Sequence, residues 1–280
     1  MSNGELVYED LIGRGRKVAT ACAWRAIVRR FEACCGVKDD YSRGDVVKYL
    51  AQLRSEGISQ NSINTMLRPV KLLCELERWG NGFPRLAMPK VRRCDVSRPR
   101  LSVGEVRNLI VKARTLRNKS GKLICSEREL AYLAAATTYG LRREEIGTLE
   151  VCDGHVTVHT AKGGEVTTHL LPGSIKRYMV GYCGANDVKY LSRVFQSLVN
   201  KVGLGLDAGY GWHSVRRALA TELFIKDVPM LHIIRFMRWS DGSVQRELGM
   251  LAIYAEREQG DIDRYIFDVH PFLPFWMLDC

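Results

Sequence analysis

The chain lacks the features that mark several large classes of protein. No run reaches about 18 apolar residues, so no membrane-spanning helix is expected, and the first residues do not have the basic-then-apolar form of a signal peptide. The nine cysteines form no Cys-x-x-Cys pair, which argues against a zinc site and fits free thiols in a reducing cytoplasm. Gly203, Gly205, Gly209 and Gly211 do not form a nucleotide-binding Gly-x-Gly-x-x-Gly motif. We therefore expect neither a metal nor a cofactor.

What the chain has in excess is positive charge. Its formal net charge is +11 over 280 residues. Residues 1–98 carry 18 Lys+Arg against 11 Asp+Glu, and the remainder carries 24 against 20, so the first third is the more basic. A polyanion is the natural partner for such a chain. A basic protein with no bound polyanion is the alternative, which charge alone does not exclude.

Apolar spacing predicts a small all-helical domain over residues 1–80. The proposed helices run over about 16–33, 43–55 and 61–79. In the first of them, Val18, Cys22, Ala26 and Val28 are predicted to lie inward, with Arg25, Arg29 and Arg30 outward. Pro69 is expected to kink or divide the third helix because proline removes a backbone donor.

Residues 81–100 form the predicted linker, in which prolines alternate with basic side chains. Proline and arginine together keep such a segment extended and cationic, so it is interpreted as a strap along a phosphate backbone. A solvated connector is the alternative. The candidate phosphate contacts are Lys90, Arg92, Arg93, Arg98 and Arg100.

The second domain, residues 101–280, is predicted to be mainly α with a small β-sheet. Serine-to-glutamate capping boxes at 102–105 and 126–129 each begin a helix. The second of these helices is almost wholly apolar and ends at Gly140, so Arg142 is expected to be held rigidly, with Glu144 or Glu145 as its partner. Alternation from 155 to 161 and from 165 to 171 predicts a β-hairpin with Lys162 at its tip.

Further along, polar groups follow one another at helical spacing. His213 and Arg216 are three residues apart, so both can reach one small anion from the same helix face. Trp239 follows a short apolar helix, and Tyr254 ends another apolar run. Each has a plainer interpretation as a core side chain.

Taken in order, these residues resemble the active site of the tyrosine recombinases, or phage-type integrases of the Xer/Cre kind. The resemblance rests on Arg142, Lys162, His213, Arg216, Trp239 and Tyr254, with Glu145 as a supporting acid. It implies a helical core-binding domain and a catalytic domain that together grip double-stranded DNA. It also implies a tyrosine that attacks a phosphodiester to leave a 3′-phosphotyrosyl bond and a free 5′-hydroxyl, without ATP or metal.

The resemblance assigns a role to each residue. Arg142 and Arg216 would bind the nonbridging oxygens, and Lys162 would protonate the leaving 5′-oxygen. His213 would donate to the phosphate or handle the tyrosine proton. Trp239 stands where the family usually has histidine, so its task would be hydrogen bonding and packing.

Several alternatives stay open. The interval between Trp239 and Tyr254 is longer than is usual in the family, so Tyr265 is the second candidate nucleophile. The apolar tail from Gln259 is expected to exchange between protomers of a tetramer on two DNA sites, with folding back on its own domain as the alternative. In place of recombination, a type IB topoisomerase-like activity or catalytically inactive DNA binding would account for the same residues.

Overall fold

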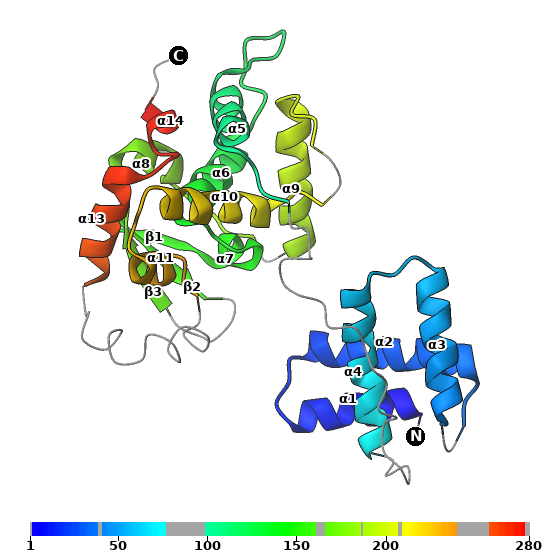
Figure 1. The fold of residues 1–280 in the computed structure, drawn as a ribbon. Coiled ribbons are helices and arrows are strands. Elements are labelled where there is room, and N and C mark those ends of the chain that lie inside the picture. Colours follow the sequence, from blue (N-terminus) through cyan, green and yellow to red (C-terminus); the bar gives the residue numbers. More distant parts are fainter. Residues whose placement is uncertain are drawn as a thin grey trace. The chain divides into compact units, whose positions relative to one another are not determined.

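The computed structural model describes residues 2–38, 41–76, 99–160, 166–185, 187–206, 209–239 and 258–277. The chain divides into two compact units, Met1–Ser97 and Arg98–Cys280, each with its own hydrophobic core (Figure 1). The predicted linker therefore lies outside the described residues, except for Pro99 and Arg100, which belong to the second unit.

The first unit is all-helical in its described part, as expected. Phe31 stands at the centre of its core, with its ring 4.8 Å from that of Tyr41 and 5.3 Å from that of Tyr49. The Asp45 carboxylate accepts a 2.8 Å bond from the Ser42 backbone N–H, which closes the capping box. The helices are α1 (Asn3–Gly13), α2 (Val18–Cys35), α3 (Arg43–Ser55) and α4 (Gln60–Leu76), and α4 is not divided at Pro69.

The predicted inward face of α2 is correct at Val28, which is buried, but wrong at Val18 and Ala26. Val18 is 60% exposed and Ala26 is exposed, whereas the buried stripe includes Ala21, Val28 and Phe31. Both stripes have helical spacing, but the stripe with the aromatic ring removes more apolar surface from water. Helix α1, which we did not predict, packs along α2 and fixes this choice.

The second unit surrounds a buried helix with other helices and one small sheet, as expected. The antiparallel sheet has the order β1-β2-β3, and Thr157 of β2 pairs with Thr168 of β3, so the predicted hairpin is present. Its elements are α5 (Val103–Thr115), α6 (Glu127–Tyr139), α7 (Arg143–Thr148), β1 (Glu150–Cys152), β2 (His155–His159), β3 (Val166–Leu170), α8 (Gly173–Met179), α9 (Val188–Lys201), α10 (Trp212–Ile225) and α11 (Met230–Phe236), followed by α13 (Gln259–Val269) and α14 (Pro274–Met277).

Helix α6 is the element around which this unit is built. Every side chain from Glu129 to Tyr139 is buried, and α6 contacts α5, α7, α8 and α10. It ends at Gly140 with φ +56°, where a Cβ atom would lie 2.7 Å from the Met237 side chain. Only glycine fits this close approach in the left-handed region. The chain therefore turns sharply at Gly140 and places Arg142 directly beside the end of α6.

The C-terminal tail packs on its own unit in this single chain. Helix α13 contacts β3 and α11, and α14 contacts α5 and α8 (Figure 1). Ile262, Ile266, Phe272 and Trp276 are fully or almost fully buried. Folding back therefore describes the isolated chain, while exchange between protomers concerns an assembly and stays a prediction. Among the residues that the structure describes, no helix is long and apolar enough to span a membrane.

Candidate active site

Arg142 caps the first turn of α7 and is held on three sides. Its backbone N–H donates to Glu145 Oε2 at 2.8 Å, and its Nη1 donates to Glu145 Oε1 at 2.5 Å. Its Nη2 donates to the Arg238 carbonyl at 3.1 Å. The side chain is 15% exposed, so the guanidinium is held in place but still reaches the surface. This is the arrangement that a preorganised anion-binding arginine requires.

Arg216, from the second turn of α10, reaches the same place from the opposite side. Its Nη1 donates to the Gly140 carbonyl at 2.5 Å, and its Nη2 donates to the Met237 carbonyl. The guanidinium lies 3.8 Å from Glu145 Oε2. Burial, together with the charges of Arg238 and Arg142, lowers the pKa of Arg216 to about 9, so the side chain stays charged at pH 7.

Glu145 is the shared counter-ion of this cluster. Its side chain is fully buried. Burial by itself raises the pKa of the carboxyl, but the charge of Arg238, the hydrogen bonds from Arg142 and the charge of Arg216 outweigh it, and the pKa is lowered. The Glu145 carboxylate, ionised at neutral pH, therefore holds Arg142 and Arg216 close together without neutralising both of them.

Sequence reasoning missed the third arginine of the cluster. Arg238 is 2% exposed, and its Nη2 lies 3.4 Å from Glu145 Oε2. It follows α11 with φ +52°, a conformation that is uncommon for a residue other than glycine. The available clue is an arginine placed directly after the short apolar helix that precedes Trp239.

His213 is the second residue of α10, one turn before Arg216, and is exposed. Partial burial, and then the charges of Arg217, Arg216 and Arg142, lower the pKa of the imidazole. The ring is therefore neutral at pH 7, with one nitrogen able to donate and the other able to accept. The neighbouring Trp212 is core, donating its indole N–H to the Leu191 carbonyl at 2.7 Å, and so fixes the start of the helix.

The other expected residues are placed only in part. Trp239 is 37% exposed and follows Arg238 directly. Lys162 and Tyr254 lie outside the described residues, as do Lys90, Arg92, Arg93 and Arg98, whereas Arg100 is described and exposed. In the sequence, Lys162 lies between His159 of β2 and Val166 of β3, and these two residues pair with each other in the hairpin. Tyr265 lies on α13, 39% exposed, with its ring 5.3 Å from that of His232.

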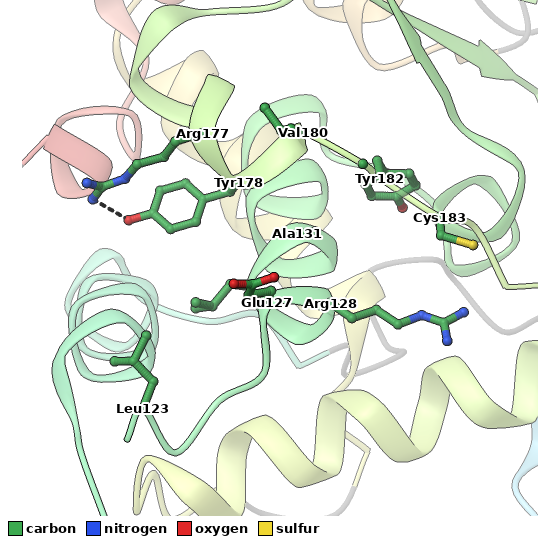
Figure 2. A pocket seen from close by; sticks show the side chains of 11 residues that line it. Leu123, Glu127, Arg128, Ala131, Arg177, Tyr178, Val180, Tyr182 and Cys183 are labelled. Carbon is green, nitrogen blue, oxygen red and sulfur yellow. Dashed lines mark hydrogen bonds between the residues drawn. The ribbon is translucent and has the colours of Figure 1, made fainter. Parts of the chain in front are cut away.

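Two cavities in the second unit differ in their relation to this cluster. One, of about 400 Å³, is lined by His213, Arg143 and Glu144, and so adjoins it. The other, of about 600 Å³, is lined by residues of α6 and α8 such as Arg128 and Tyr178 (Figure 2). None of the expected site residues lines that second cavity.

A basic groove of about 690 Å³ lies on the first unit. Its lining includes Arg14, Arg16, Arg68 and Lys71, with Trp24 among them. Two of these groove residues make ion pairs, Arg14 with Asp10 and Lys71 with Glu75, as do the arginines of α2 that we expected to face outward. Arg25 and Arg29 pair with Glu5, and Arg30 pairs with Glu56. The groove gathers basic side chains around one hollow, so it is a candidate surface for a phosphate backbone.

The two units together have the fold of the tyrosine recombinases, which confirms the fold and the resemblance expected from the sequence. No protein-family model and no curated protein matches the sequence. A lambda integrase dimer bound to a COC′ core site is similar over 86% of this chain and 95% of that one, with a TM-score of 0.67 and 16% identity. A lambda integrase tetramer bound to a Holliday junction covers 86% of this chain and 77% of that one, also at 0.67 and 16%. The XerH site-specific recombinase in a post-cleavage complex with a palindromic difH substrate matches with a TM-score of 0.61 and 12% identity, over 87% of this chain and 82% of that one.

Proposed function

We propose that the chain is a tyrosine-type site-specific DNA recombinase, or integrase. The observation that carries the proposal is the convergence of Arg142 and Arg216 on the buried Glu145, with the neutral His213 one turn away on α10. Two guanidinium groups fixed beside each other can each give paired hydrogen bonds to nonbridging phosphate oxygens. The fold of this chain is also that of proteins crystallised as recombinases on their DNA sites.

The reaction is a pair of transesterifications. The hydroxyl oxygen of Tyr254 attacks the phosphorus, and the bond from phosphorus to the 5′-oxygen breaks. His213 accepts the tyrosine proton or donates to the phosphate, and Lys162 supplies a proton to the leaving 5′-oxygen. The 3′-phosphotyrosyl bond conserves the energy of the phosphodiester, so a 5′-hydroxyl from another strand reverses the step without ATP or a metal.

Arg142 and Arg216 stabilise the charge that the transition state develops on the nonbridging oxygens. Glu145 orients Arg142, and Trp239 packs beside the site and offers its indole N–H as a donor. The rigidity of the arginines matters because a displacement of about 1 Å can cost ~10²-fold in rate.

The partner is double-stranded DNA, gripped by both units. The groove with Arg68 and Lys71 would bind the phosphate backbone, together with the linker residues Lys90, Arg92, Arg93, Arg98 and Arg100. A homotetramer on two sites, with exchange of C-terminal segments, would bring the strands together. The free cysteines fit action in a reducing cytoplasm.

The test uses a duplex with a nick close to the cleavage position, so that the short fragment diffuses away and the covalent adduct accumulates. The wild-type chain should form the adduct without added metal, and Arg142→Lys and Arg216→Lys should reduce it by ~10²-fold or more because lysine cannot form the paired hydrogen bonds. DNA binding without any adduct would refute the proposal and leave a binding protein. Relaxation of supercoiled plasmid by a monomer would instead favour a type IB topoisomerase-like activity.

The same nicked duplex can show whether Tyr254 or Tyr265 is the nucleophile. Tyr254→Phe and Tyr265→Phe each remove one hydroxyl and leave packing and charge almost unchanged. We expect Tyr254→Phe to abolish the adduct and Tyr265→Phe to retain it, because Tyr265 lies on α13 beside Asp261 and Asp268, whose charges would repel a phosphate. An adduct that persists in Tyr254→Phe would show that this assignment is wrong.

A further inference from the structure

Arg238 has more hydrogen-bond partners than the proposed reaction explains. Its Nη1 donates to His169 Nε2 at 2.9 Å and to the Phe236 carbonyl at 2.8 Å. Its Nη2 donates to the Tyr139 carbonyl at 2.9 Å and lies 3.4 Å from Glu145 Oε2. Four of the five N–H donors are thus engaged in a site that water does not reach. A buried cation is costly unless it is satisfied in this way.

The backbone at Arg238 also holds the two arginines assigned to the phosphate. The Met237 carbonyl accepts from Arg216, and the Arg238 carbonyl accepts from Arg142 at 3.1 Å. Arg238 has φ +52°, a strained conformation for a residue other than glycine, which persists only where the surroundings enforce it. The turn at 237–238 therefore presents two successive carbonyls to the two guanidinium groups.

A chain of hydrogen bonds connects this turn to the C-terminal tail. Arginine can only donate, so His169 Nε2 must accept from Arg238, and His169 Nδ1–H then donates to Asp263 of α13 at 2.9 Å. The Asp263 carboxylate also accepts from the Leu170 backbone N–H at 2.7 Å and from the Gln259 amide at 2.8 Å. Asp263 and His169 are both fully buried.

We propose that Arg238 is a positioning residue of the strand-transfer site, which sets the geometry of Arg142 and Arg216 and is itself fixed through His169 by Asp263 of α13. This inference rests on the proposed function. Docking of α13 then completes the chain of hydrogen bonds that fixes Arg142 and Arg216 in position. The stability of the fold does not by itself require this buried ionic cluster, since apolar side chains of similar volume often replace such clusters without loss of unfolding free energy.

Two variants test the two ends of the chain of hydrogen bonds. Arg238→Gly removes the guanidinium but suits the left-handed backbone, so the two carbonyls can stay in place. Asp263→Asn keeps the shape of the side chain, but its amide must turn an N–H group toward one of three donors that now face a carboxylate. Neither residue touches the proposed phosphate position.

The matched control is His270→Gln, which disturbs the same tail elsewhere. His270 Nε2 donates to the Thr138 carbonyl at 3.0 Å, and its Nδ1 accepts from the Phe272 and Leu273 backbone N–H groups. None of these bonds belongs to the chain from Asp263 to Arg238. A general loosening of the tail should therefore affect His270→Gln as much as Asp263→Asn.

The measurements are the dissociation constant for intact duplex and the single-turnover rate of adduct formation on saturating nicked duplex. We expect binding to change less than about twofold, while the rate falls by ~10²-fold in Arg238→Gly and ~10-fold in Asp263→Asn, and stays near the wild-type rate in His270→Gln. Equal rates in all three variants, or a fall in the control equal to that in Asp263→Asn, would overturn the inference.

A second readout does not depend on catalysis. The side-chain Nε–H resonances of Arg142 and Arg216, assigned with the two arginine-to-lysine variants, report their surroundings in the DNA-free protein. Both should shift in Asp263→Asn and stay fixed in His270→Gln, whether or not the wild-type chain forms an adduct. Unshifted resonances in Asp263→Asn would overturn the positioning role, whereas shifted resonances without a wild-type adduct would refute only the proposed reaction.

Discussion

The two units each gather several arginines around one glutamate, but they do so in different surroundings. In the first unit Glu5 pairs with Arg25 and Arg29, and these side chains are 31–58% exposed. In the second unit Glu145 is fully buried among three arginines that are 2–15% exposed. Water screens the first cluster, so its pairs contribute little. In the second cluster the loss of a partner leaves a charge in surroundings with little water, so the ion pairs hold the guanidinium groups in fixed positions.

The largest expected effect is that of Glu145→Gln. The amide keeps the volume but leaves two buried cations, Arg216 and Arg238, and the part-buried Arg142 without their counter-charge, so the second unit should lose about 3–5 kcal/mol of unfolding free energy. Urea denaturation measures it. Glu144→Gln is the control, because Glu144 is half-exposed and lies 3.6 Å from the exposed Arg143. Comparable losses in both variants would show that burial does not separate the two kinds of cluster.

The contrast between predicted and missed residues follows from the range of the interactions. Arg142 and Arg216 were predicted because a helix end at Gly140 and an i, i+3 pair are local patterns. Arg238 was missed because its role depends on φ +52° and on His169, which is 69 positions away. The His169–Asp263 pair, 94 positions apart, leaves no trace in local spacing.

The first unit illustrates the same limit. Three of its helices were predicted, but α1 was not, since its only buried residues are Gly4, Val7 and Leu11. Gly4 is buried because it allows close approach to α2, where an added Cβ would meet Arg25 and Arg29 at 3.3 Å. Apolar periodicity cannot reveal a contact that depends on a missing side chain, and without α1 the face of α2 was predicted correctly at Val28 but wrongly at Val18 and Ala26.

The two units are also expected to differ in how their stability depends on pH. All six histidines lie in the second unit. Burial lowers the pKa of His270 to about 3, well below the ordinary value near 6.5. The unfolded chain therefore binds a proton that the folded chain does not, so stability is lost as the pH falls from about 6.5 toward 3.

Hydrogen exchange of α13 and α14 measures this loss, with α2 as the internal reference. We expect the tail to lose protection between about pH 6 and 5, while α2, whose unit has no histidine, changes little. His270→Gln should reduce the pH sensitivity of the tail over that window, and the remainder belongs to the buried His169, whose pKa burial also lowers. Equal acid sensitivity in α2 would remove histidine burial as the cause.

The basic groove of the first unit should affect binding and leave folding almost unchanged. Arg68→Gln with Lys71→Gln removes two charges from the groove, so the slope of log K against log salt should become shallower by about 2. Arg43→Gln with Lys48→Gln removes the same charge from exposed positions on α3 and is the control. A slope that changes equally in both pairs would mean that net charge, and not the groove, binds the duplex.

The smallest expected effect is that of Glu5→Gln, which completes the comparison with Glu145. The variant removes the partner of Arg25 and Arg29, yet both guanidinium groups still reach water, and Arg25 also lies 4.8 Å above the Tyr8 ring. The midpoint of thermal unfolding of the first unit should therefore fall by less than about 4 °C, and less still at 0.5–1 M salt, where the screening length is only about 3–4 Å. Calorimetry at low and high salt measures both. A large loss that persists in high salt would mean that the close approach at Gly4 desolvates the Glu5 cluster, so that it resembles the Glu145 cluster after all.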